Sequence, residues 1–533
     1  MEKRENPSSL PILSLSLPLP QENEKLHDLM EVDQRNDKGS CNSCSVVKET
    51  KKQVWLAGPL IIVGLLTFSL HVISLMFVGH LGNLPLAAAS LATSFAYVTG
   101  FSVLLGMASA LETVCGQSYG AKQYKMVGVH TQRAMLVLCL LSIPISITWY
   151  NTKYILVVVG QDHTIASEAA SYVKFMIPGL IPYGLIQCLF RYFQTQNMVF
   201  PMILSSGITT SLHIVICWSL VFTFGLGSKG AAIANVVSYW INLMILAIYV
   251  QYSSSCSKTW NGFSIASLQG IPAFLRLSVS STAMLCLEFW SFEMVILLSG
   301  YLPNPVLETS ALSICLNLIT LVWVIHEGLS GGVSTRVSNE LGARNPQCAR
   351  LAVHVALSMT ICECIFVGLL LMMLRDVWGY SYTQDLEVVK YLTAMMPLIV
   401  IANFLTGVTC VLYGIARGCG WQKIGAYISL TSFYLIGLPI SILLAFHMHI
   451  GGKGLWLGFI SAFLIQVLSL SAITMNTNWE KEAKKAKIRV FGSNILEDES
   501  QALYIMEDGR PQCQDADKEA EWINGDPHAT HNN

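Results

Sequence analysis

The chain has 533 residues, of which 53% are apolar or aromatic and 12% are charged, and its formal net charge is −1. An ordinary soluble domain carries about 25% charged residues, and single soluble cores stop growing beyond about 250–300 residues. The mean hydropathy of +0.53 therefore excludes one oversized soluble core and indicates a protein whose solvent is a bilayer. The near-zero net charge gives no indication of nucleic acid binding.

The two ends of the chain differ from its middle. Residues 1–53 are rich in Ser, Pro, Asp, Glu and Lys, which predicts a disordered cytosolic tail and not a secretory signal. From Trp479 the chain becomes charged again and stays polar, so 479–533 is predicted to be a second cytosolic tail. Cys41 and Cys44 form a lone CxxC pair. Because one half-site cannot close a tetrahedral zinc centre, we expect no metal.

Twelve apolar runs lie between the tails, each near the roughly 20 residues that a helix needs to cross a bilayer. Lys and Arg gather in the loops after the even-numbered runs, and this bias places both tails in the cytosol. An even number of spans also requires the tails to share a side. The predicted spans are 54–77, 85–109, 128–149, 167–190, 199–224, 230–252, 274–300, 308–331, 350–375, 386–413, 424–446 and 453–475.

The two halves repeat, which predicts an all-α integral membrane protein of twelve helices in two six-helix lobes. The N-lobe is expected at 54–252 and the C-lobe at 274–478, joined by a cytosolic loop at 253–273. Six spans per unit make the repeat parallel, so the substrate cavity is expected between the lobes. Four short motifs match in order at nearly one offset: Gly79 with Gly300, Gly120 with Gly342, Pro178 with Pro397, and Gly230 with Gly454.

Two acids lie in the seventh predicted span. Glu288 is near its middle and Glu293 is five residues further on. An acid at mid-membrane depth costs about 2.5–3.5 kcal/mol on insertion scales, so it is kept where it faces a polar interior. Burial favours the protonated form of a carboxyl group, which makes proton uptake a plausible function. We interpret Glu288 and Glu293 as proton-coupling residues, with neutral carboxyls that serve packing alone as the alternative.

Other polar and aromatic residues suggest a gate and a cavity. Glu112, Arg336 and Arg417 form a candidate cytosolic gate, with a purely structural role as the alternative. Glu327 and Glu363 are expected to pair with basic residues, and isolated histidines such as His326 to be satisfied core residues. Aromatic rings can stack on a flat organic cation, although most aromatic residues in spans serve packing. The candidate substrate cavity comprises Tyr97, Phe289, Trp290, Asn317, Trp323, Thr406 and Tyr413.

Four segments carry a family resemblance: LETVCGQSYGAKQY, CLEFWSFEMVILLSGYLPNPVLETS, RVSNELGARNP and VLYGIARGCGWQKIGAY. They resemble plant members of the multidrug and toxic compound extrusion (MATE) family, and the DETOXIFICATION branch above all. The similarity runs from about Val54 to Asn478. It implies antiport of protons against organic cations, alkaloids, flavonoid-type metabolites or xenobiotics by alternating access, driven by the proton gradient without a cofactor. It also implies that Glu288 is the principal proton carrier and Glu293 a second acid.

The sequence departs from the family pattern at two positions. Ser74 stands where bacterial relatives carry an aspartate, and Thr406 stands where many plant relatives carry one. Thr406 cannot ionise, so Glu288 acts with Glu293 or alone, or the coupling is weakened. A membrane sensor on a transporter scaffold and a lipid flippase therefore remain as alternatives. No HExxH or GxSxG motif lies in a predicted loop, so the loops give no indication of an enzyme. We expect a monomeric, multi-pass protein of the vacuolar or plasma membrane.

Overall fold

The computed structural model describes residues 45–381 and 385–492. Within these ranges there are twelve helices long and apolar enough to cross a membrane, and no strand. The all-α class and the twelve predicted spans are thereby confirmed. Helices are the expected solution, because a backbone in hydrocarbon must satisfy its hydrogen bonds within the segment.

The first lobe holds six of these spans, and several contain a short turn of π- or 3₁₀-helix. In chain order its elements are α2 (Val46–Gly79), α3 (Asn83–Ala96), η2 (Tyr97–Phe101), α4 (Ser102–Ser109), α5 (Leu111–Gly120), α6 (Tyr124–Tyr150), the short α7 (Thr152–Val158), α8 (His163–Met176), η3 (Ile177–Gly179), α9 (Leu180–Thr195), α10 (Phe200–Trp218), η4 (Ser219–Thr223) and α11 (Ser228–Tyr252).

The second lobe repeats this plan. Its elements are α12 (Ile271–Ser299), α13 (Pro305–Gly342), α14 (Pro346–Trp378), η7 (Gly379–Ser381), α15 (Leu386–Cys419), α16 (Gln422–Ser429), η8 (Leu430–Gly437), α17 (Leu438–Ile442), η9 (Leu443–His447) and α18 (Gly452–Met475). A further helix spans residues 479–492. Helices α13 and α14 each begin with proline in the first turn, which is a common helix start. Helix α15 ends at Gly420, whose left-handed backbone (φ +84°) is a common helix stop.

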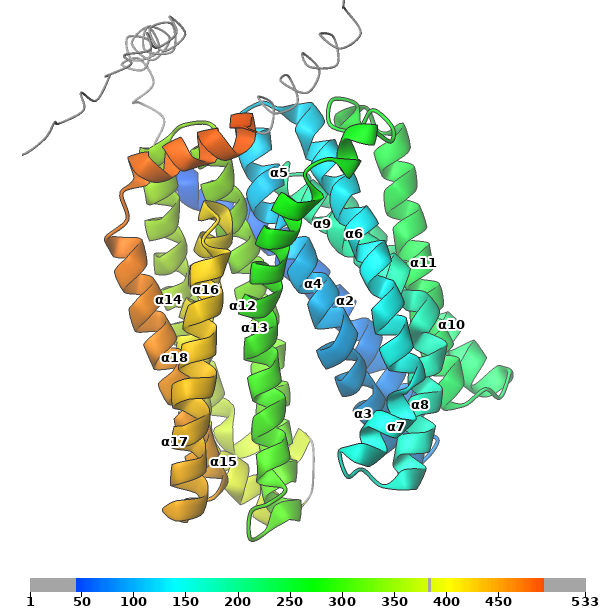
Figure 1. Cartoon of the computed structure of the whole chain (residues 1–533). Helices are drawn as coiled ribbons and strands as arrows, with labels where there is room; N and C mark the ends of the chain where they lie inside the picture. Colours follow the sequence, from blue (N-terminus) through cyan, green and yellow to red (C-terminus); the bar gives the residue numbers. More distant parts are fainter. Residues whose placement is uncertain (1–44, 382–384, 493–533) are drawn as a thin grey trace, which may run out of the picture.

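Both lobes begin at the same end of the molecule, as a parallel repeat requires (Figure 1). We call this the tail end: it holds the start of α2, the end of α13, the end of α15 and helix 479–492. Arg489 of that helix donates to Gln117 of α5 at 2.6 Å, which ties the C-terminal helix to the first lobe. From the tail end the two lobes diverge toward the opposite end of the bundle (Figure 1).

Both expected tails contain helix where the structure describes them. Helix α2 begins at Val46, inside the predicted tail 1–53, because Glu49 and Gln53 are buried against the second lobe. Gln53 donates to the Ala352 carbonyl at 2.8 Å, and these contacts stabilise polar residues in a helix. The buried face of helix 479–492 includes Trp479, Ala483, Ala486 and Val490. The remaining tail predictions, including Cys41 and Cys44, lie outside the described residues.

The segment between the lobes packs on the first lobe. It contains the short 3₁₀ helices η5 (Ser254–Cys256) and η6 (Ile265–Leu268), and α12 begins at Ile271, within the loop predicted at 253–273. Gln132 of α6 donates to the Gly262 carbonyl at 2.8 Å and accepts from the Ser264 amide at 2.9 Å. These bonds anchor the segment at the point where α12 starts.

Candidate functional site

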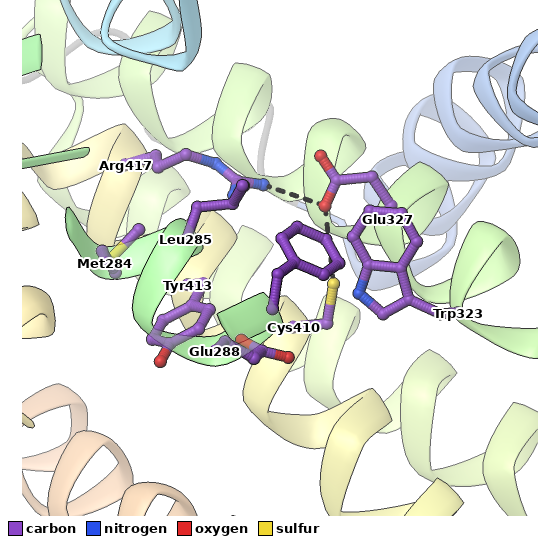
Figure 2. Close-up of a pocket in the computed structure, with 9 residues that line it drawn as sticks. Met284, Leu285, Glu288, Trp323, Glu327, Cys410, Tyr413 and Arg417 are labelled. Carbon is purple, nitrogen blue, oxygen red and sulfur yellow. Dashed lines mark hydrogen bonds and ion pairs between the residues drawn. The ribbon is translucent and has the colours of Figure 1, made fainter. Parts of the chain in front are cut away.

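A pocket lies in the second lobe around Glu288, and we call it the central pocket. Helices α12, α13 and α15 supply its walls, and Figure 2 shows the carboxylates of Glu288 and Glu327 with Arg417 in one view. The lining residues are Met284, Leu285, Glu288, Phe289, Trp323, Glu327, Cys410, Tyr413 and Arg417. The lining combines aromatic and apolar side chains with two acids and one guanidinium group.

Glu288 is only 7% exposed, yet among the described residues no hydrogen bond reaches its carboxylate. Tyr413, which lines the same pocket, does form hydrogen bonds. Its hydroxyl group lies 2.7 Å from Ser429 Oγ of α16 and accepts from Gln466 Nε2 of α18 at 2.7 Å. Buried charged groups without hydrogen-bond partners are costly. The described residues around Glu288 therefore supply no hydrogen bond to its carboxylate.

An ionic network crosses between the lobes beside the central pocket. Glu112 of α5 accepts from Arg417 Nε of α15 at 2.9 Å and pairs with Arg191 Nη1 of α9 at 3.1 Å. Glu327 of α13 completes the ring, 3.4 Å from Arg191 and 3.5 Å from Arg417. Each lobe thus contributes one acid and one base. The four charges cancel, which is what permits such groups to be buried.

Arg336 belongs to a separate ion pair. Its guanidinium group donates to both carboxylate oxygens of Glu49, at 2.8 and 2.9 Å, and it also contacts Glu340. The three predicted gate residues are therefore divided between two inter-lobe contacts. Glu112 and Arg417 meet in the ionic network, and Arg336 ties the start of α2 to α13.

Small residues let the backbones of the two lobes touch at the tail end. A Cβ atom on Gly120 of α5 would collide with the Asn339 carbonyl of α13, and one on Gly342 of α13 would collide with the Gln117 carbonyl of α5. These two glycines were matched by the sequence repeat, and each packs against the other's helix. Only glycine allows backbones to approach this closely. The tail end is therefore a tightly packed, closed contact.

Midway along the bundle, contacts between the lobes gather on the π-helical segment η2. Tyr97 of η2 stacks edge-on against Phe289 of α12, with ring centroids 5.2 Å apart, and Phe289 stacks in turn on Trp323 at 5.4 Å. Trp290 Nε1 donates to the Val98 carbonyl at 3.1 Å. Single π-turns are frequent at functional sites. Among the described residues, the hydrogen bonds between the two lobes all lie between the level of η2 and the tail end.

The predicted cavity residues fall into three groups. Phe289, Trp323 and Tyr413 line the central pocket with Glu288, and Tyr97 contacts it through Phe289. The other cavity residues lie outside the pocket: Trp290 is 39% exposed, Asn317 is exposed, and Thr406 is buried in α15. The second predicted proton-coupling residue, Glu293, also lies outside it and is partly buried further along α12. The α-helical rotation of 100° per residue separates Glu293 from Glu288.

Two members of the ionic network were not predicted as functional. Arg191 was placed in the loop after the predicted span 167–190, because a charge next to an apolar run looks like the end of a span. Glu327 was read as a structural residue within the predicted span 308–331. In the structure α9 runs to Thr195, so Arg191 also lies inside a helix. The pairing of Glu327 with basic residues was predicted, and it is confirmed. One feature of the sequence could have indicated the network: residues of opposite charge lie near the tail-end termini of several spans.

The first lobe contains a polar cluster at Ser74. Ser74 Oγ lies 3.1 Å from His213 Nε2 and accepts from Asn235 Nδ2 at 2.9 Å, and His213 Nδ1 lies 2.8 Å from Ser238 Oγ. His213 is a satisfied core histidine, as predicted. The cluster holds no carboxylate among its members.

Comparisons with known proteins agree with this architecture. The MatE family model matches residues 59–219 and 281–443, which are the bodies of the two lobes. Protein DETOXIFICATION 16 of Arabidopsis thaliana is 58% identical over 85% of this chain and 93% of its own length. Protein DETOXIFICATION 17 of the same species is 56% identical over 84% of this chain and 94% of its own length.

Solved structures show the same arrangement. The crystal structure of the eukaryotic MATE transporter AtDTX14 is 47% identical, with a TM-score of 0.81 over 84% of this chain and 99% of that one. An outward-facing multidrug resistance MATE transporter matches the fold at 15% identity, with a TM-score of 0.73 over 82% of this chain and 97% of that one. The chain belongs to the multidrug and toxic compound extrusion family and is a multi-pass membrane transporter of small compounds, not an enzyme.

Proposed function

We propose that the protein is a proton-coupled antiporter that exports or sequesters small organic compounds, and that Glu288 carries the coupling proton. The observation that supports this most is the placement of Glu288: it is buried, its carboxylate receives no hydrogen bond from the described residues, and it lines the same pocket as Arg417. Arg417 is at the same time the residue that joins the two lobes through Glu112. One side chain thus connects the proton site to the closed tail end.

The proposed coupling between proton binding and opening of the tail end follows from competition among carboxylates for the guanidinium group of Arg417. While Glu288 is protonated, Arg417 is held by Glu112 and Glu327, and the tail end stays closed. When Glu288 loses its proton, it becomes a third carboxylate that attracts Arg417, besides Glu112 and Glu327, and this weakens the bond between Arg417 and Glu112. The central pocket has room for about one water molecule, with a volume of about 10 Å³, so a substrate cation reaches Glu288 only when the pocket widens. The cation then neutralises Glu288 in place of the proton, so proton and substrate exclude each other. Exclusive occupancy of one site is the requirement for exchange.

The expected substrates follow from the pocket lining. Phe289, Trp323 and Tyr413 offer aromatic faces, and Glu288 and Glu327 offer negative charge. This combination favours flat organic cations and neutral aromatic metabolites such as alkaloids and flavonoid-type compounds. The basic loops place the tail end in the cytosol, and the structure then corresponds to a state closed to the cytosol. We expect a vacuolar or plasma membrane location and a monomer.

Purified protein in liposomes tests this function. A fluorescent organic cation is supplied under an imposed pH gradient, and its accumulation is followed before and after a protonophore collapses the gradient. We expect uphill accumulation that disappears on collapse. Flux that is indifferent to the gradient would contradict proton coupling, and absence of any flux with a range of cations would favour a sensor. Transport of a labelled lipid in place of the cation would favour a flippase.

A further inference from the structure

Three metal-ligating side chains meet in the second lobe, away from the central pocket. His326 of α13 is fully buried, and its Nε2 atom lies 3.1 Å from Glu363 Oε2 of α14. Cys364 Sγ lies 3.8 Å from the same His326 nitrogen and 3.4 Å from Glu363 Oε2. All three ligand atoms lie within 4.8 Å of one another. The sequence had suggested an isolated core histidine and a glutamate paired with a basic residue.

We propose that His326, Glu363 and Cys364 form a binding site for a soft divalent cation of the zinc type. Bond lengths of about 2.0–2.1 Å to nitrogen, 2.0–2.2 Å to oxygen and 2.3 Å to sulfur give tetrahedral edges of about 3.4–3.6 Å. The observed separations of 3.1, 3.8 and 3.4 Å are close to these edges. Nitrogen, oxygen and sulfur ligands together favour zinc-like ions over magnesium or calcium.

The backbone of α15 packs directly against these ligands. A Cβ atom on Gly407 would lie 2.5 Å from Cys364 Sγ and 2.9 Å from His326 Nε2. Both distances are shorter than a van der Waals contact, so the glycine is what lets the cysteine and the histidine come together beside α15. A larger residue at 407 would push these two ligands out of place.

The polar atoms of the cluster are not saturated by the protein. Glu363 Oε1 and His326 Nδ1 are buried and have no hydrogen-bond partner within the described residues. The carboxylate thus has a second oxygen available as a ligand. The thiol of Cys364 also points toward the Phe404 carbonyl, 4.0 Å away. Cys364 also lines an apolar groove between α14 and α15, so the cluster is open to this groove on its cysteine side.

Charge neutrality makes the ion compatible with a buried site. A neutral imidazole, a carboxylate and a thiolate carry two negative charges together, and a divalent cation cancels both. Isolated charges in a low-dielectric interior are costly, but a neutral complex is not. Binding requires the thiol to release its proton and the imidazole to be unprotonated.

Cadmium is the spectroscopic probe for this site, because a cadmium–thiolate bond has a charge-transfer band in the ultraviolet. The full chain, with Cys41 and Cys44 changed to serine, is purified in detergent and titrated with Cd²⁺. We expect a band that saturates at one ion per chain and is lost in Cys364→Ser. Cys362→Ser removes an exposed cysteine two residues away and should leave the band unchanged. A band of equal size in Cys364→Ser would overturn the proposal.

Two further measurements do not depend on removing the cysteine. Zn²⁺ should slow alkylation of Cys364 at least tenfold in the otherwise unaltered chain, measured by peptide mass spectrometry, while Cys362 reacts at its former rate. Gly407→Ala displaces Cys364 and His326 without removing a ligand, so it should abolish this protection. Unchanged alkylation of Cys364 in the presence of Zn²⁺ would show that the cluster is only a hydrogen-bonded junction. Neither result depends on transport or on Glu288.

Discussion

Glu112 of the first lobe accepts a hydrogen bond from Arg417 Nε of the second lobe at 2.9 Å, and the two side chains are 0% and 2% exposed. Alternating access at the tail end requires this contact to open, because the lobes cannot separate there while it is formed. Removal of one partner from a buried ion pair costs about 3–5 kcal/mol, since the other charge is left uncompensated. Separation of the lobes must therefore provide both charges with water or with other partners.

Glu112→Gln keeps the size of the side chain and removes its charge, so Arg191 and Arg417 are left to share Glu327. We expect the free energy of unfolding in detergent to fall by about 3–5 kcal/mol. Asp376→Asn is the matched control, because Asp376 pairs with Arg375 at the surface, with the two side chains 69% and 47% exposed. An exposed pair contributes about 0–1 kcal/mol. Equal losses in the two variants would contradict a special role for Glu112.

The glycine contacts at the tail end give a second prediction. Gly120→Ala and Gly342→Ala place a methyl group against a carbonyl of the other lobe, and overpacking of this kind costs about 1–3 kcal/mol. We expect the closed tail end to loosen, so that hydrogen exchange accelerates in α5 and at the end of α13. Gly207→Ala is the control, because a Cβ atom there meets nothing within 4 Å. Exchange that is unchanged in both tail-end variants would mean that the lobes are not held by this contact.

The twelve-helix architecture could be predicted because each span is determined by the residues of its own segment. Each span is an apolar run of bilayer length, and the match of Gly120 with Gly342 indicated the repeat before the structure placed each glycine against the other's helix. The ends of the helices could not be predicted from hydropathy. Arg191 and Arg417 look like loop residues until their partners from other helices are known, and those partners are distant in sequence.

The candidate site could be predicted only in part, because the sequence does not show contacts between helices. Glu288 could be identified because an acid in the middle of an apolar run is costly wherever the chain folds. The cavity residues depend on rotation about each helix and on neighbours, so Phe289 lines the central pocket while the adjacent Trp290 bonds to Val98. The cluster of His326, Glu363 and Cys364 joins two helices, and neither helix alone indicates it.

Thr406 gives the third prediction, because it is buried in α15 and its hydroxyl group has no hydrogen-bond partner within the described part of the chain. Thr406→Asp adds a titratable group to the second lobe, and we expect the pH dependence of transport to change. Asn403, one turn earlier, has an unpartnered side-chain amide that can receive the new carboxyl group. Thr406→Asn is the control, since it has the same shape as aspartate but cannot ionise. Identical pH profiles for the two variants would show that residue 406 does not face the proton pathway.

The last prediction concerns Glu288, on which the proposed coupling depends. Glu288→Gln preserves the shape of the side chain and fixes it in a neutral form. Arg417 then meets no new carboxylate in the central pocket at any pH, so its bond to Glu112 is not weakened. We expect the variant to fold and reach the membrane, and to lose accumulation driven by a pH gradient.

Glu293→Gln is the matched control, because it makes the same chemical change on the same helix outside the central pocket. Its effect on accumulation should be milder. The measurement is cation accumulation in liposomes at equal protein content, with thermal stability recorded for each variant. Full gradient-driven accumulation in Glu288→Gln would rule out this residue as the proton carrier. A stability loss large enough to explain the missing transport would instead assign Glu288 a packing role, since a group that only carries a proton tolerates its neutral isostere.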